Sequence, residues 1–192
     1  MATPSTFARR VAAIAGEQFD EFHMRHESDP PLENQIRKYW TDLGFTFPGV
    51  GTAWSAVFVS WCLLKAGATS AEFRFAKAHS RFVNWAIKNQ ERGDGLFHGF
   101  DITSHAPSIG DLVHNNRSGN RLTFDFARTH TQYESHSAIV IETGQDSAGR
   151  YLLTVGGNEG DSVGKKEVRL TAAGLVKQRT NSPFISVIQN LK

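Results

Sequence analysis

Hydrophobic residues in the first half of the chain recur at spacings of three and four, which is typical of helices with one buried face. This pattern predicts helices over residues 5–26, 32–43, 53–66 and 73–89. In the first of these, the apolar positions are Phe7, Val11, Ile14, Ala15, Phe19 and Phe22. Pro30 and Pro31 end that segment, because proline cannot continue a helix interior.

The segment 53–66 differs from the other three because it is apolar on almost every side. Such a helix is expected to be buried at the centre of the molecule. Thr52 is positioned to cap its N-terminus, and Gly67 is positioned to end it.

Beyond residue 93 the hydrophobic period changes to short runs rich in β-branched residues, separated by Gly, Asn and Asp. These runs predict strands over residues 111–113, 121–126, 137–142, 150–155, 166–170 and 184–188. Residues 146–149 predict a hairpin turn. Helices followed by a meandering sheet indicate an α+β fold. We expect one domain over residues 1–192, with N-terminal helices in 1–47 and the core in 48–192.

Composition narrows the function classes. The chain has 192 residues, of which 40% are hydrophobic, and a formal net charge of +2, which argues against a nucleic-acid-binding protein. Its one cysteine excludes an internal disulfide and a cysteine-based metal site. No apolar run is long enough for a membrane span, and no signal peptide is recognised. We therefore expect synthesis in the cytoplasm, no membrane span, no bound metal and no cofactor.

Three polar segments carry the candidate chemistry. Ser55 falls at the first turn of the apolar helix, where free N–H groups and the helix dipole stabilise an anion. His136 opens a buried strand, and Asn158 follows Gly157 at the end of the next strand. A nucleophile, a histidine and a carboxamide in this order are the layout of papain-like hydrolases.

Each segment also has a simpler interpretation when taken alone. A serine at a helix start is commonly a cap, a histidine at a strand end commonly satisfies its own hydrogen bonds, and Gly-Gly-Asn is a common turn. Their joint order and spacing favour a site.

The amino-acid sequences of these segments resemble those of the NlpC/P60 and CHAP peptidoglycan hydrolases. Residues 54–61 (Trp-Ser-Ala-Val-Phe-Val-Ser-Trp) are similar to their nucleophile helix, which reads Trp-Cys-Ala-x-Phe-Val. Residues 107–113, with Pro-x-x-Gly-Asp, and residues 136–140 (His-Ser-Ala-Ile-Val) are similar to two of their strands. Residues 78–82 (Ala-His-Ser-Arg-Phe) and 156–163 (Gly-Gly-Asn-Glu-Gly-Asp-Ser-Val) resemble most the bacterial family catalogued as domain of unknown function 2272.

The resemblance, which covers roughly residues 50–175, implies a papain-like fold with a buried nucleophile helix and an antiparallel sheet. It implies hydrolysis of amide bonds in peptidoglycan, with Ser55 as nucleophile, His136 as general base and acid, and Asn158 orienting the histidine ring. The residues expected to contact substrate are Trp54, His79, Asp111 and Gly157. A wall-directed enzyme without a leader would be a secreted antibacterial effector or a lysin, so a secretion carrier and an immunity protein are expected partners.

Two of these assignments keep an alternative. His79 either packs beside the aromatic face of its helix or lines the substrate cleft. Asp111 either holds a loop or supports a histidine.

The departure from the superfamily is the serine itself, because the corresponding residue is a cysteine. A serine hydroxyl is much less acidic than a thiol and must lose its proton to a base during attack. Cys62 lies about 10 Å further along the helix, so we expect it to be a packing residue.

Three interpretations of Ser55 are open: a working nucleophile, the remnant of a site in a binding module that has lost its chemistry, or a cysteine replaced by design. Other acyl chemistry, such as lipid or thioester transfer, is a further alternative because fold does not fix function.

Overall fold

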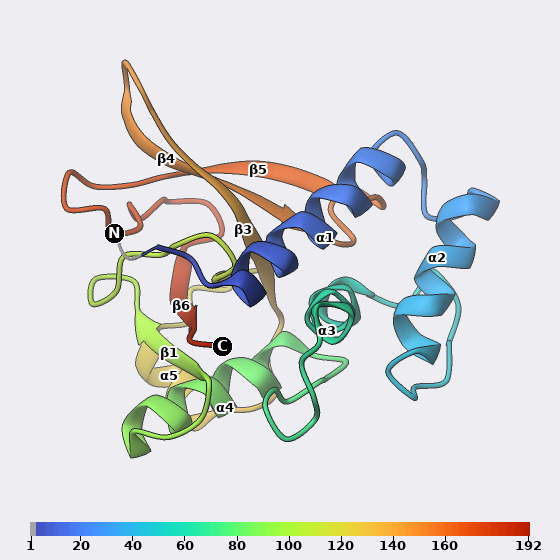
Figure 1. Cartoon of the computed structure of the whole chain (residues 1–192), viewed down its shortest axis with the longest axis horizontal. Coiled ribbons are helices and arrows are strands. Elements are labelled where there is room, and N and C mark those ends of the chain that lie inside the picture. Colours follow the sequence, from blue (N-terminus) through green and yellow to red (C-terminus); the bar gives the residue numbers. More distant parts are fainter. Residues whose placement is uncertain (1–2) are drawn as a thin grey trace.

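The computed structural model describes residues 3–192 and contains a sheet with helices packed on it (Figure 1). The helices are α1 (Thr6–Phe22), α2 (Pro30–Thr41), α3 (Ser55–Ala66), α4 (His79–Arg92) and α5 (Phe124–Thr129). The strands are β1 (Phe97–Asp101), β2 (Leu112–Asn116), β3 (Ser135–Asp146), β4 (Gly149–Gly156), β5 (Gly164–Arg169) and β6 (Phe184–Asn190). The chain therefore has the mixed α+β architecture that the hydrophobic pattern predicts.

The first three predicted helices are present as α1, α2 and α3. Gly67 ends α3 in the left-handed conformation, with φ of 105°, as predicted. The predicted cap is wrong, because Trp54 occupies the N-cap position and no side chain caps the helix. The fourth helix begins at His79 instead of residue 73, because Phe73 is buried in a loop against Phe82 and Phe97.

The six strands form one antiparallel sheet in the order β1-β6-β2-β3-β4-β5. β3 and β4 are joined by the predicted hairpin turn, where Asp146 pairs with Gly149. β6 lies between β1 and β2 although it is the last strand in the sequence.

Two sequence predictions in the second half are corrected by the structure. Residues 121–126 do not form a strand, because Thr123 accepts a hydrogen bond from the Phe126 N–H and so caps α5. The sequence pattern also missed β1. Gly99 interrupts the run of larger side chains in the sequence of that strand, and no side chain fits there because a Cβ would lie 2.6 Å from Ile87 on α4.

The sheet has a large core on one face and a smaller one on the other. Helices α1, α3 and α4 bury the first face, with Leu112, Ile139 and Val155 contributed by the sheet. In Figure 1, α3 lies near the middle of the molecule and α2 packs on its outer side, away from the sheet. The largely apolar α3 is therefore at the centre, and its first turn is buried.

Residues 3–192 contain no helix that is both long and apolar enough to cross a membrane.

Candidate active site

Ser55 lies at the first residue of α3 and is hydrogen-bonded to a histidine. Its Oγ is 2.7 Å from Nε2 of His79, which is itself the first residue of α4. Both side chains are almost completely buried. The sequence predicted that His79 would contact substrate, and the structure places it directly on the candidate nucleophile.

His79 is a poor site for a positive charge. Burial lowers its pKa well below the ordinary value, and the neighbouring His136 and His114 lower the pKa further. The other ring nitrogen, Nδ1, is buried and has no hydrogen-bond partner among the described residues. His79 is therefore neutral at pH 7, and no carboxylate is bonded to it to stabilise its cation.

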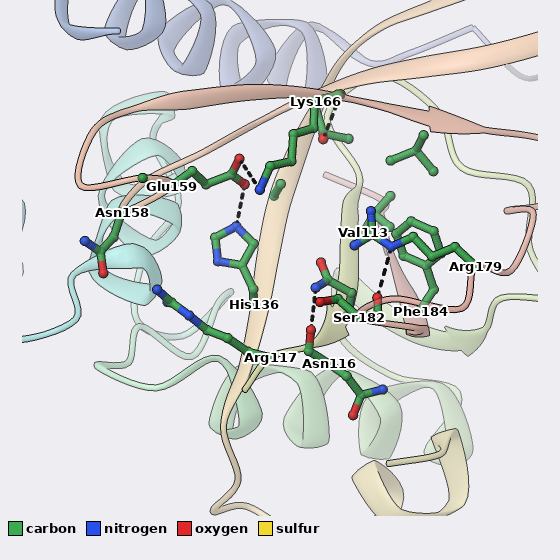
Figure 2. Close-up of a pocket in the computed structure, with 15 residues that line it drawn as sticks. Val113, Asn116, Arg117, His136, Asn158, Glu159, Lys166, Arg179, Ser182 and Phe184 are labelled. Atoms are coloured by element: carbon green, nitrogen blue, oxygen red, sulfur yellow. Dashed lines mark hydrogen bonds and ion pairs between the residues drawn. The ribbon is translucent and has the colours of Figure 1, made fainter. Parts of the chain in front are cut away.

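His136, by contrast, is held by a carboxylate. Its Nε2 donates to Oε1 of Glu159 at 2.7 Å, and Oε2 of Glu159 lies 2.9 Å from Nζ of Lys166 (Figure 2). Burial favours protonated Glu159, but His136 and Lys166 outweigh it and lower the pKa of this carboxyl. Because a carboxylate only accepts hydrogen bonds, the proton of neutral His136 sits on Nε2, and Nδ1 is free to take another.

Glycines make the room for this ion pair. A Cβ at Gly156 would lie 2.6 Å from Oε1 of Glu159 and 2.7 Å from Nε2 of His136. A Cβ at Gly164 would lie 2.6 Å from the Cβ of Glu159. Gly156, from the Gly-Gly-Asn segment, and Gly164, from β5, therefore leave room for the buried Glu159 side chain next to the histidine.

Asn158 forms no hydrogen bond with His136, although both residues line the same cavity. It adopts a left-handed conformation with φ of 55°, and its Nδ2 donates to Oε2 of Glu27 at 3.0 Å. The predicted role of Asn158 in orienting the His136 ring is therefore filled by Glu159 in this structure.

The same Glu27 oxygen binds Trp54. The indole Nε1 donates to it at 2.8 Å, and the ring is fully buried against Tyr39. In place of the expected contact with substrate, Trp54 ties the start of α3 to the loop between α1 and α2. Gly157 likewise packs inside, since a Cβ there would lie 2.6 Å from Trp54 and from Phe58.

Asp111 is remote from these residues. Its carboxylate accepts hydrogen bonds from the N–H groups of Ser108 and Asn190 and lies 3.4 Å from His105. Asp111 directly precedes β2, in which Asn115 is the partner of His136, so Asp111 lies four residues, or about 13 Å, along the sheet from the level of His136. Of its two predicted interpretations, the structure favours the holding of a loop.

The candidate residues line two neighbouring cavities. One has a volume of about 340 Å³ and includes Ser55, His79 and Tyr133 in its wall. The other has a volume of about 180 Å³ and is shown in Figure 2; His136, Asn158 and Glu159 line it. Arg117 lines both, and the rings of His79 and His136 are 5.3 Å apart between centroids.

Cys62 is fully buried and unpaired, as predicted, and burial raises the pKa of its thiol. Within residues 3–192 no group of three or more His, Cys, Asp or Glu side chains is arranged to hold a metal ion.

A family model described as "Uncharacterized protein conserved in bacteria (DUF2272)" matches residues 30–186. The chain belongs to this family. No curated protein and no solved structure matches the chain. The family match includes Ser55, His79, His136 and Glu159, whereas Glu27 lies before it.

Two residues of the site were missed from the sequence. Glu159 stands directly after the Gly-Gly-Asn segment, and a carboxylate so near a predicted turn was the available signal. Glu27 had no local signal, because it reaches Trp54 and Asn158 only through the packing of α1.

Proposed function

We propose that this protein is a papain-like hydrolase that cleaves amide bonds in peptidoglycan peptides. The proposal rests on one observation above all: Ser55, at the start of a buried helix, is hydrogen-bonded to His79, and the ring of His79 lies 5.3 Å from that of His136, which is held by a buried carboxylate. The family resemblance of the surrounding segments supplies the substrate class.

In the proposed mechanism, Ser55 Oγ attacks the amide carbonyl carbon and His136 Nδ1 takes its proton. Glu159 orients the imidazole and stabilises the imidazolium that forms, which a carboxamide does less well. The leaving amine takes the proton from His136, and water then hydrolyses the ester on Ser55 with the same histidine as base. The first N–H groups of α3 have no intrahelical acceptor and are available to the oxyanion.

His79 is assigned a positioning role. It holds the Ser55 hydroxyl through Nε2, but proton uptake would leave an uncompensated cation in a buried place next to two other histidines. His136 has the carboxylate that His79 lacks.

Incubation with purified peptidoglycan, followed by chromatography of the soluble products, tests the proposal. We expect new muropeptides with the natural protein and none with Ser55→Ala. Ser55→Cys is the useful third sample, because a thiol needs less help from a base. Absence of products from both the natural protein and Ser55→Cys would refute hydrolysis.

A second candidate function is a binding module for wall peptides. The observation that favours it is the placement of Ser55 and His136 in different cavities, with His79 on the hydroxyl. Tight binding of a wall peptide that survives His136→Ala, without any turnover, would support it over the hydrolase.

The proposed substrate lies outside the cytoplasm, so we propose delivery by a dedicated secretion route, with an immunity protein protecting the producing cell. Fractionation of producing cells checks this. Detection only in the cytosol, under every growth condition, would argue against an exported effector.

A further inference from the structure

The carboxylate of Glu159 is shared between two partners from different strands. Its Oε1 lies 2.7 Å from Nε2 of His136 on β3, and its Oε2 lies 2.9 Å from Nζ of Lys166 on β5. In Figure 2 the carboxylate lies between the imidazole ring and the ammonium group, with a dashed line to each. The proposed mechanism uses the bond to His136 and leaves the bond to Lys166 without a role.

The two partners of Glu159 differ in burial. The side chains of His136 and Glu159 are 9% and 6% exposed, whereas that of Lys166 is 57% exposed on the edge strand β5. A buried carboxylate that had the histidine as its sole partner would favour a proton on both ring nitrogens, because a positive ring compensates its charge. A histidine that already carries both protons cannot accept one from a serine hydroxyl.

The other groups around His136 are neutral or positively charged. Besides Glu159 and Lys166 they are His79 on α4, His114 on β2, and Arg117 and Arg179 in the wall of the same cavity. Burial lowers the pKa of both of these histidines, so they are neutral at pH 7. Among the described residues that line the cavity, Glu159 supplies the one carboxylate, and Lys166 is the cation bonded to it.

The pairing of β5 with β4 places Lys166 at the carboxylate. Lys166 lies opposite Thr154, whose Oγ1 donates to the Lys166 carbonyl at 3.2 Å. Lys165 precedes it and points to the other face of the sheet, where its ammonium lies 4.3 Å from the centre of the Phe19 ring. Two adjacent lysines therefore differ in one respect that matters here, which is the bond to Glu159.

We infer that Lys166 is a positioning residue for the proposed base: it shares Glu159 with His136 and so keeps the imidazole neutral, with Nδ1 ready to take a proton. A cation bonded to the same carboxylate makes a positive charge on the ring less favourable. It also holds Oε2, so that Oε1 stays directed at Nε2 of His136. The use of His136 as a base rests on the proposed function, but the effect of Lys166 on its charge does not.

NMR of protein labelled with ¹⁵N-histidine measures the charge of His136, because the shifts of the ring nitrogens distinguish the neutral and doubly protonated forms. The signals of His136 are those missing from His136→Gln. In Lys166→Met we expect the pH at which half of these rings carry both protons to rise by about one unit, because the competing cation is gone. Water screens the exposed ammonium, so the rise is smaller than for a fully buried cation. An unchanged or lower half-protonation pH would overturn the inference.

Two further variants separate charge from structure. Lys166→Arg keeps a cation beside Glu159 and should keep the half-protonation pH close to that of the natural protein. Lys165→Met makes the same chemical change one residue away and should leave it unchanged. An equal rise in Lys165→Met and Lys166→Met would show a general effect of lost positive charge and would refute the role of Lys166.

Activity supplies a second measurement. With a soluble muropeptide, the acid limb of the pH profile of kcat/KM should move to higher pH in Lys166→Met by the same amount as the half-protonation pH, whereas a merely structural role would lower kcat/KM at every pH.

The two proposals fail in different ways. A raised half-protonation pH in Lys166→Met, without muropeptide release by the natural protein, would refute the hydrolase and support the effect of Lys166 on His136. Muropeptide release with an unchanged half-protonation pH would support the hydrolase and refute the role of Lys166.

Discussion

Glu159 is the residue on which the proposed chemistry depends most, because it fixes the tautomer of His136 and compensates its positive charge. Glu159→Gln keeps the size of the side chain but removes the charge. We expect turnover of peptidoglycan to fall by about 10²- to 10⁴-fold, as expected when the group that orients a general base is neutralised. Steady-state kinetics with a soluble muropeptide measures this.

Glu142→Gln is the matched control for Glu159→Gln, because Glu142 is exposed on β3. It should keep full activity. Full activity of Glu159→Gln itself would show that the carboxylate does not support the base.

Because the proposal gives His79 and His136 different roles, substituting each by glutamine should change the activity differently. In His79→Gln the side-chain amide can still reach Ser55 Oγ, so we expect a loss of no more than about ten-fold and an unchanged pH profile for kcat/KM. In His136→Gln the proton acceptor is gone, and activity should fall by about 10²-fold or more.

The reverse order of effects would make His79 the base. His79→Ala, which removes the hydrogen bond to Ser55, should be worse than His79→Gln if the role of His79 is to position the hydroxyl. The pH profile separates this role from a merely structural one.

At this scale the sequence predicted Ser55 and His136 as residues placed at the ends of buried elements, and the structure brings both into one region. The sequence could not predict whether Asn158 or Glu159 would turn its side chain toward His136. The left-handed backbone at Asn158 places its side-chain amide against Glu27. The Glu159 carboxylate then accepts the hydrogen bond from the His136 ring. This choice depends on a contact from the loop between α1 and α2, which no local sequence pattern at residues 158–159 records.

Among the elements, the loop between α1 and α2 supports the site from outside. Glu27 accepts hydrogen bonds from Trp54, which precedes α3, and from Asn158, which follows β4. Glu27→Ala removes both and leaves two polar groups without their partner. We expect the free energy of unfolding to fall by about 1–3 kcal/mol, measured by urea denaturation.

Glu17→Ala, at an exposed position on α1, is the control and should change the free energy of unfolding by less than about 0.5 kcal/mol. If Glu27→Ala loses activity at a temperature where it stays folded, the loop between α1 and α2 supports the site. Equal stability of Glu27→Ala and Glu17→Ala would contradict the role of the loop.

The elements themselves were predictable where the hydrophobic period was long, as in α1 and α3. Short segments were misjudged. Residues 121–126 contain aromatic and β-branched side chains that are typical of strands, but the structure has a helix of six residues there, capped by the hydrogen bond that Thr123 accepts from the Phe126 N–H. β1 was missed because it contains Gly99, a residue that is unfavourable in strands. Close packing on α4 requires a residue without a side chain at this position.

For the whole molecule, buried neutral histidines predict a loss of stability in acid. Burial and His136 lower the pKa of His114 to about 3, and the pKa of His79 is also well below its ordinary value. The unfolded chain binds protons at both sites below about pH 6.5, whereas the folded chain does not. Stability should therefore fall as the pH drops from about 6.5 toward 3, by up to about 1.4 kcal/mol per pH unit for each histidine.

Urea denaturation between pH 7 and pH 4 measures this slope. His114→Gln should make it shallower, because one of the two buried proton-binding sites is gone. His130→Gln, which removes an exposed imidazole from the end of α5, controls for the loss of a histidine as such. An identical slope in the natural protein and His114→Gln would contradict the assignment.

The place of β6 in the sheet has a consequence for the protein during its synthesis. β6 lies between β1 and β2 and pairs with both. Until residues 184–190 have left the ribosome, the backbone N–H and C=O groups with which β1 and β2 pair with β6 therefore have no strand to bond to. β2 carries the strand pairing that places His136, since Asn115 is its partner. The nascent chain therefore has α3 and the β2–β3 pairing that places His136 available before β6, whereas β1, whose one neighbour in the sheet is β6, can join the sheet only after residues 184–190 have been synthesised.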